Sequence, residues 1–205
     1  MLKVGLTGGI ACGKSKALLC FEQLGAFTVD ADKIAREVVR PGQPAYQRIL
    51  DEFGPGMVGT GGELDRAKLG DLVFSDDSAR IKLNSIVHPF VLAEEDLLVQ
   101  ALEKNPHQYP MVVTDAALMV EVGSYAKYNV VIVAYCPPSI QLERLMKRNA
   151  LSKAEAMTRV SSQMPLLEKI GYADYIIDTS RDPAETQEQI RHIYAELVER
   201  NWVEG

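Results

Sequence analysis

The sequence predicts an α/β fold built around a five-stranded parallel sheet, and two features of its hydrophobic pattern support this. Short apolar runs rich in β-branched residues recur along the chain, and segments of helical periodicity separate them. Runs such as Val130-Val131-Ile132-Val133 are apolar at every position, as strands are when helices cover both faces of a parallel sheet. The expected strands are residues 2–7, 27–30, 111–115, 130–135 and 175–178.

The segments between these strands predict the domain organisation. Residues 31–105 are long for one crossover and read as mostly helical, so we expect an inserted helical subdomain there. Residues 144–171 are again helical but rich in lysine and arginine, which indicates a mobile lid. The core is then expected to consist of residues 1–30, 106–143 and 172–205.

The C-terminal segment has the pattern of one amphipathic helix. Asp182 is the expected N-cap and Pro183 the first helical residue. The apolar face repeats at helical spacing through Ile190, Ile193, Tyr194, Leu197 and Val198.

Composition and charge indicate a folded soluble protein and exclude several classes. The chain has 205 residues, of which 47% are hydrophobic and 24% charged, as in ordinary globular proteins. The net charge of −6 argues against a broad surface for nucleic acid. The sequence has neither a signal peptide pattern nor a long apolar segment that could span a membrane. We therefore expect a cytoplasmic protein, a monomer or small homo-oligomer, without nucleic-acid or membrane partners.

The three cysteines do not form a recognisable site. They are odd in number and lack C-x-x-C spacing, which argues against a disulfide framework and a zinc site. Free thiols in a reducing compartment fit better, and any metal is expected to arrive with a nucleotide.

One motif carries most of the chemistry. Residues 8–15, G-G-I-A-C-G-K-S, match G-x-x-x-x-G-K-[S/T] between an apolar strand and a helical run, which predicts a phosphate-binding loop. Its glycines let backbone N–H groups surround phosphate oxygens, Lys14 reaches the β- and γ-phosphates, and Ser15 supplies a hydroxyl to Mg²⁺. The expected nucleotide contacts are Gly8, Gly9, Ile10, Ala11, Cys12, Gly13, Lys14, Ser15 and Lys16.

Two carboxylates follow the second expected strand, at the edge of the sheet where α/β proteins bind ligands. Asp30 and Asp32 are two residues apart, so in extended chain they share a face. One of them is then positioned to accept the proton of an attacking hydroxyl. The alternative is that Asp30 caps a helix that starts near Lys33.

Other charged residues give weaker signals. Arg144 and Arg148 are four apart and share one helix face, so they either clamp phosphates or form an ordinary solvated face. Asp115 ends the third expected strand and Glu121 follows it, where either could contact magnesium through water. His88 precedes Pro89 in a helical stretch and is more typical of a structural histidine than of a ligand.

Several longer motifs resemble one family, the dephospho-coenzyme A kinases. The similarity covers nearly the whole chain, and D-A-D-x-x-A-R together with the H-P segment is its most specific feature. The matching segments are V-G-L-T-G-G-I-x-x-G-K-S, D-A-D-K-I-A-R-E-V-V-x-P-G, G-x-L-D-R-x-x-L, L-N-S-I-V-H-P, C-P-P-x-x-Q-L-x-R and A-D-Y-I-I-D.

The resemblance implies transfer of the γ-phosphoryl group of ATP to the ribose 3′-hydroxyl of dephospho-coenzyme A, the last step of coenzyme A synthesis. It also implies a P-loop NTPase fold of the adenylate-kinase-like, three-layer type, with a helical substrate-binding insertion and a lid. On matching positions, Asp32 resembles the base, Arg144 the lid arginine and Thr7 a residue near the transferred group. Arg36, His88 and the retained Glu121 are assigned to the acceptor side, and Arg148 to the nucleotide.

Some positions depart from the family pattern. Ala117 replaces a proline, Lys16 replaces a small hydroxyl residue, and Asn149 and Thr179 replace an aspartate and an asparagine. Three alternatives therefore stay open: another small-molecule kinase of the same architecture, a nucleotide-dependent switch, and a non-catalytic nucleotide binder. The switch would require a guanine-reading N-K-x-D motif, which the sequence lacks.

Overall fold

The structure, a computed structural model, describes residues 1–105 and 108–203 and divides into two compact units. The sheet unit comprises Met1–Asp30 and the described residues from Leu102 onward, and the helical unit comprises Ala31–Ala101. The expected core boundary at residue 106 lies outside the described residues. Each unit is described by itself below.

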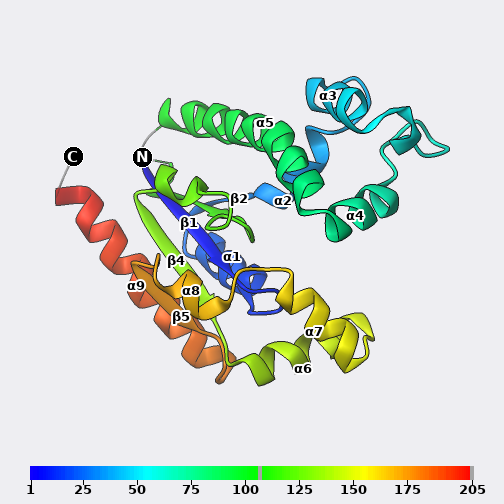
Figure 1. Cartoon of the computed structure of the whole chain (residues 1–205). Helices are drawn as coiled ribbons and strands as arrows, with labels where there is room; N and C mark the ends of the chain where they lie inside the picture. The colour runs from blue at the N-terminus through cyan, green and yellow to red at the C-terminus, as the bar shows by residue number, and fades with distance from the viewer. Residues whose placement is uncertain (106–107, 204–205) are drawn as a thin grey trace. The chain divides into compact units, whose positions relative to one another are not determined.

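The sheet unit contains the predicted parallel sheet (Figure 1). Within the described residues the sheet has five strands in the order β2-β3-β1-β4-β5, and every neighbouring pair is parallel. The strands are β1 (Leu2–Gly8), β2 (Phe27–Asp30), β3 (Met111–Asp115), β4 (Val130–Tyr135) and β5 (Tyr175–Asp178). This confirms the predicted α/β class and all the expected strands, with β1 one residue longer than expected.

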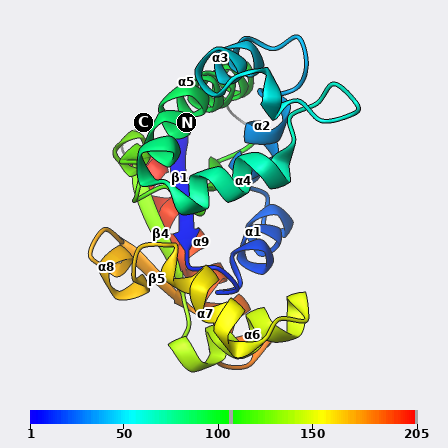
Figure 2. The same cartoon turned by 45° about the vertical axis from the view of Figure 1, so that its right-hand side comes forward.

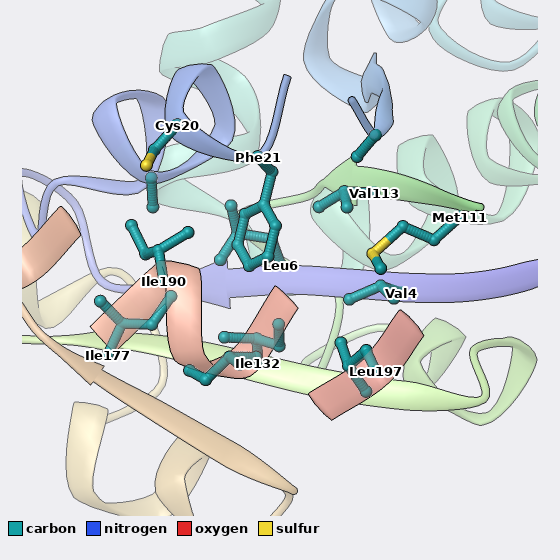
Figure 3. Packing of buried hydrophobic residues seen from close by; sticks show 13 residues of the cluster. Val4, Leu6, Cys20, Phe21, Met111, Val113, Ile132, Ile177, Ile190 and Leu197 are labelled. Carbon is teal, nitrogen blue, oxygen red and sulfur yellow. The ribbon is translucent and has the colours of Figure 1, made fainter. Parts of the chain in front are cut away.

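Alternate residues of the strands build the main hydrophobic core on one face of the sheet (Figure 3). Helix α1 (Lys14–Gln23) contributes Phe21 to this core, and helix α9 (Pro183–Val203) contributes Ile190 and Leu197. Because side chains alternate between faces along a strand, the residues at every second position share this core. These strand residues are Val4, Leu6, Met111, Val113, Ile132 and Ile177.

The start of α9 is as the sequence predicts. Asp182 precedes Pro183, and its Oδ1 accepts a hydrogen bond of 2.7 Å from the backbone N–H of Ala184, which is an N-cap contact. The predicted apolar face of α9 packs on the core, with Ile193 buried and Tyr194 partly buried.

Three helices follow β4 in the sheet unit, in the segment with the expected lid. They are α6 (Pro138–Asn149), α7 (Lys153–Ser161) and α8 (Leu166–Ile170). Helices α6 and α7 lie side by side in both views (Figures 1 and 2). Ser152 caps α7, and its hydroxyl accepts from the N–H of Glu155, whose carboxylate accepts from the N–H of Ser152.

The helical unit has its own small core. Its elements are α2 (Ala31–Glu37), α3 (Pro44–Phe53), the 3₁₀ turn η1 (Pro55–Met57), α4 (Arg66–Ser75) and most of α5 (Asp77–Glu103). Ile49, Leu64 and Leu69 form the buried centre of this core. Pro89 lies inside α5, so the H-P segment is part of a continuous helix and starts no new one.

The structure corrects the local conformation expected after β2. Helix α2 begins at Ala31, directly after Asp30, and not near Lys33. Asp32 therefore lies in the first turn of a helix, where residues two apart do not share a face, so the extended arrangement of Asp30 and Asp32 was wrong. The spacing of Asp30 and Asp32 suits an extended chain, but the chain becomes helical directly after Asp30.

Among the residues that the structure describes, no helix combines the length and the apolar character that a membrane span requires.

Candidate active site

The phosphate-binding loop (residues 8–15) connects β1 to α1 and has the backbone that its glycines allow. Gly13 has φ 82°, a left-handed conformation, and lies directly before α1. At Gly8, a side chain would place its Cβ only 2.4 Å from the backbone oxygen of Ala134, so only glycine fits beside β4. The N-terminus of α1 has no side-chain cap and no acidic residue in its first turn. Its first N–H groups and the positive end of its dipole therefore favour an anion.

A basic cavity of about 600 Å³ opens beside this loop. Lys14, Ser15 and Lys16 line it from the loop and the start of α1, and α6 adds three further cations, Arg144, Lys147 and Arg148. Cys20, Pro183 and Ile190 add apolar surface to the lining, and Arg181, just before α9, adds a further cation. The cavity thus combines cationic and apolar lining, which suits a nucleotide.

Arg144 is held in this cavity by Thr179. Its Nη1 donates to Thr179 Oγ1 (3.1 Å) and its Nη2 donates to the Thr179 carbonyl (2.6 Å). The Thr179 hydroxyl also lies 3.0 Å from the carbonyl oxygen of Cys12 in the loop and 3.1 Å from that of Tyr135. One threonine therefore joins the loop, the end of β4 and the arginine. Arg148 is exposed, and its Nε donates to Asn149 Oδ1 (2.9 Å).

Two glutamines fix the tip of the loop from the side of α6 and α7. The backbone N–H of Ile10 donates to Gln163 Oε1 (2.8 Å), and Gln141 Nε2 donates to the carbonyl of Ile10 (2.9 Å). A Cβ at Gly9 would lie 2.5 Å from Gln141 Nε2, so the second glycine leaves room for this contact. The loop is thus held by side chains as well as by its own backbone.

A fully buried lysine, Lys169 on α8, lies under the same site. Its Nζ contacts Glu121 Oε1 (2.7 Å) and the carbonyl oxygen of Ala117 (2.7 Å), which also accepts from Thr7 Oγ1 (3.3 Å). Burial lowers the pKa of Lys169, the carboxylate of Glu121 opposes that shift, and the charge of Lys14 lowers it further. Glu121 Oε2 is buried and has no hydrogen-bond partner among the described residues.

The remaining predicted site residues lie in the helical unit. Asp32 and Arg36 are exposed on α2, and Arg36 lines a cavity of about 510 Å³ together with Lys33, Arg40 and Arg66. His88 is partly buried in α5, and burial lowers its pKa below the usual 6.5.

The structure therefore groups the predicted residues into two sets. Within the sheet unit it brings together Thr7, residues 8–16, Glu121, Arg144 and Arg148. Asp32, Arg36 and His88 belong to the helical unit. Sequence reasoning missed Gln141, Gln163, Lys169 and the anchoring role of Thr179. Gln141 is the Q of the C-P-P-x-x-Q-L-x-R motif, which was the available signal, whereas Gln163 and Lys169 belong to none of the matching segments.

Comparisons with known proteins identify the family. A family model described as dephospho-CoA kinase matches residues 2–185. The chain belongs to the dephospho-CoA kinase family. A dephospho-CoA kinase of Geobacillus kaustophilus is 45% identical over 193 residues, which cover 92% of this chain and 93% of the relative.

Solved structures agree with the family and the fold. A dephospho-CoA kinase from Campylobacter jejuni superposes with a TM-score of 0.69 at 29% identity, over 97% of this chain and 98% of that one. The Thermus thermophilus protein TT1252 reaches a TM-score of 0.79 at 28% identity, over 96% of this chain and 97% of that one. The expected P-loop kinase fold is thereby confirmed.

Proposed function

We propose that this protein phosphorylates dephospho-CoA: it transfers the γ-phosphoryl group of ATP to the ribose 3′-hydroxyl and yields coenzyme A and ADP. The observation that carries the proposal is the uncapped phosphate-binding loop facing a basic cavity, in a chain of the dephospho-CoA kinase family. In the reaction the 3′-oxygen bonds to the γ-phosphorus as the bond from that phosphorus to the bridging oxygen of ADP breaks.

On the donor side, the loop and its two cationic neighbours bind the triphosphate. Lys14 neutralises the β- and γ-phosphates, and Arg144, held by Thr179, offers a preorganised planar donor to the transferring group. Arg148 adds charge at the edge of the cavity. Thr7, bonded to Ala117 beside the loop, supports the position of the transferred group.

The site fits a magnesium ion that enters with the nucleotide. Ser15 is exposed at the uncapped N-terminus of α1 and lines the cavity, so its hydroxyl could be a ligand. In the described part of the chain no group of three or more His, Cys, Asp or Glu side chains forms a metal site of its own. When bound, the ion would neutralise charge on the phosphates.

On the acceptor side, Asp32 accepts the proton of the 3′-hydroxyl. Its support is its exposed position in the first turn of α2, directly after β2, and its match to the family motif. Arg36 lines a cavity with Lys33, Arg40 and Arg66, and the carboxylates of Glu37 and Glu63 line it too. The excess of positive charge suits the pyrophosphate of dephospho-CoA. His88 and Glu121 complete the proposed acceptor set, and their support is their match to the family motifs.

We also propose that the lid moves only in part. Arg144 is tied to Thr179 at the start of residues 144–171, and Gln163 and Lys169 are tied to Ile10 and Ala117 near the end. The part of the lid that is free to move is then centred on α7, while the two ends of residues 144–171 stay attached near the phosphate-binding loop. Helix α7 carries its own capping box, so it can move as a rigid helix.

The first test is an acceptor panel. The purified protein, ATP and Mg²⁺ are incubated with dephospho-CoA, shikimate, gluconate and adenosine, and ADP release and phosphorylated product are measured by chromatography. We expect transfer to dephospho-CoA alone. Transfer to one of the other alcohols but not to dephospho-CoA would establish another small-molecule kinase, and no transfer would establish a non-catalytic binder.

The second test concerns the base. Asp32→Asn keeps the shape of the side chain but removes its basicity, so we expect kcat to fall by about 100- to 10,000-fold while ATP still binds. Asp30→Asn, two residues earlier, is the matched control and should lose far less. Equal rates of Asp32→Asn and the wild type in single turnovers would refute the base assignment.

A further inference from the structure

Two buried cysteines face each other beneath the phosphate-binding loop. Cys12 belongs to the loop and Cys136 follows the end of β4, so they are 124 residues apart in sequence. Their Sγ atoms are 3.4 Å apart, within hydrogen-bonding distance, and neither residue has exposed surface. Both are free thiols. The proposed transfer reaction has no use for either sulfur.

The surroundings favour a thiolate on one of the two sulfurs. The hydrogen bond with Cys12 lowers the pKa of Cys136 to about 7, against the opposing effect of burial. Arg144 and the hydroxyl of Thr179 lower it further. Cys12 keeps its proton, because its pKa is raised by the same hydrogen bond and by burial. A thiol beside a thiolate is the arrangement from which a disulfide forms.

We propose that Cys12 and Cys136 are a reversible oxidation site, at which a hydroperoxide converts the two thiols to a disulfide that blocks the nucleotide site. The sulfur of Cys136 attacks the peroxide oxygen, which gives a sulfenic acid and, with hydrogen peroxide, one water. The sulfur of Cys12 then attacks that sulfur, the S–S bond forms, and a second water leaves. Two thiols thus lose two electrons to one peroxide, and a dithiol reverses the step.

The disulfide would displace the loop. An S–S bond is about 2.05 Å long, so the sulfurs must approach by about 1.4 Å from their present 3.4 Å. The carbonyl of Cys12 accepts from the hydroxyl of Thr179, and Thr179 holds Arg144, so a shift of Cys12 also disturbs the arginine. Misplacement of phosphate-binding groups by about 1 Å is enough for a loss of about 100-fold in rate.

The loop that carries Cys12 lines the basic cavity, and both sulfurs are fully buried while this loop keeps its present conformation. The oxidant therefore reaches the pair from the cavity when the loop opens. A nucleotide seated on the loop would cover this route and fix the loop backbone, so bound ADP should protect the pair. Cys20 on α1 is the third thiol of the chain and also lines the cavity, which makes it the matched control.

The experiment uses the full chain and follows the disulfide directly. The protein is treated with hydrogen peroxide with and without Mg-ADP, remaining thiols are alkylated, and peptides are mapped by mass spectrometry. We expect a Cys12–Cys136 cross-link that dithiothreitol removes and that Mg-ADP suppresses. If Cys12 and Cys136 are both still fully alkylated after peroxide treatment without nucleotide, the proposal is overturned. This measurement needs no acceptor, so its failure is distinct from failure of the proposed kinase activity.

The rate of phosphate transfer after peroxide treatment is then compared with the rate of the same protein before treatment. Treatment should lower the phosphate transfer of the wild type and of Cys20→Ser by about 100-fold, with recovery in dithiothreitol. Cys136→Ser should keep most of its own untreated rate. If Cys136→Ser loses activity as completely as the wild type, the disulfide is not the cause; the cross-link map of the wild type decides the matter should that variant fail to fold.

Discussion

At the scale of single residues, the buried charge of Lys169 is the feature with the largest expected effect on stability. Its ammonium group contacts Glu121 and Ala117 and is fully buried. Lys169→Met leaves a largely buried carboxylate without its partner, which should lower the free energy of unfolding by about 3–5 kcal/mol. Urea denaturation followed by circular dichroism measures this.

A control variant distinguishes the loss of the Lys169–Glu121 ion pair from the loss of a lysine side chain in general. Lys153→Met removes an exposed lysine at the start of α7 and should change the free energy of unfolding little. The double variant Lys169→Met/Glu121→Leu should be more stable than Lys169→Met alone, because no unpaired charge remains. Additive losses in the double variant would show that the two side chains are not coupled.

Arg144 and Arg148 offer a second comparison between residues. Both line the basic cavity, but Arg144 makes two hydrogen bonds to Thr179, whereas Arg148 donates a hydrogen bond to its exposed neighbour Asn149. A lysine cannot reproduce the planar pair of donors, so Arg144→Lys should lower kcat/KM by roughly 100-fold. Steady-state kinetics of Arg148→Lys, the matched control, should show a clearly smaller loss. Equal losses would contradict the special role of Arg144.

The residues of the site were predictable to the extent that they belong to a local motif. The loop from Gly8 to Ser15 could be read from its spacing, because a strand, a turn and a helix start impose it. The contacts of Gln141 and Gln163 with Ile10, and of Lys169 with Ala117, could not be read in this way, because they join segments far apart in sequence. Thr179 looked like a departure from the family pattern, whereas in the structure it anchors Arg144.

At the scale of secondary structure, the start of α9 is held by its cap. Asp182 accepts from the N–H of Ala184, and this helix supplies Ile190 and Leu197 to the main core. Asp182→Ala should lower the free energy of unfolding by about 1 kcal/mol, because an N–H group at the helix start loses its partner. Chemical denaturation measures the change. Asp182→Asn keeps a capping oxygen and should lose much less; an equal loss would assign the effect to the charge.

Periodicity predicted the strands well and one helix start badly. The apolar runs of β3 and β4 are buried on both faces, so nothing competes with their hydrophobic signal. Helix α2 has no such signal at its start, because Asp30-Ala31-Asp32 suits both an extended chain and a helix first turn. The acidic residue in the first turn, which favours the positive end of the helix, was the overlooked cue.

At the scale of the whole molecule, the class of fold followed from the alternation of strands and helices, and the strand order did not. Sequence order places β2 beside β1, whereas the sheet inserts β3 between them. That arrangement puts the ends of β1 and β3 side by side, with Leu6 paired to Asp115. Such pairing depends on long-range packing, which no local pattern of residues encodes.

The stability of the molecule should depend on pH through His88. Burial lowers the pKa of His88 in the folded protein below its usual 6.5, so the unfolded chain takes up this proton first. Stability is then highest above about pH 6.5 and falls as the pH drops towards the folded pKa, with a slope of at most about 1.4 kcal/mol per pH unit from this group.

His88→Gln removes the contribution of this imidazole to the pH dependence of stability. The variant should therefore lose less stability than the wild type between about pH 7.5 and 5. Urea denaturation followed by far-ultraviolet circular dichroism suits this test, because α5, which carries His88, belongs mostly to the helical unit. His192→Gln replaces an exposed histidine and should leave the pH dependence of the wild type intact. If both variants follow the wild type across this range, the acid sensitivity arises from the carboxylates, and His88 is no more than a neutral packing residue.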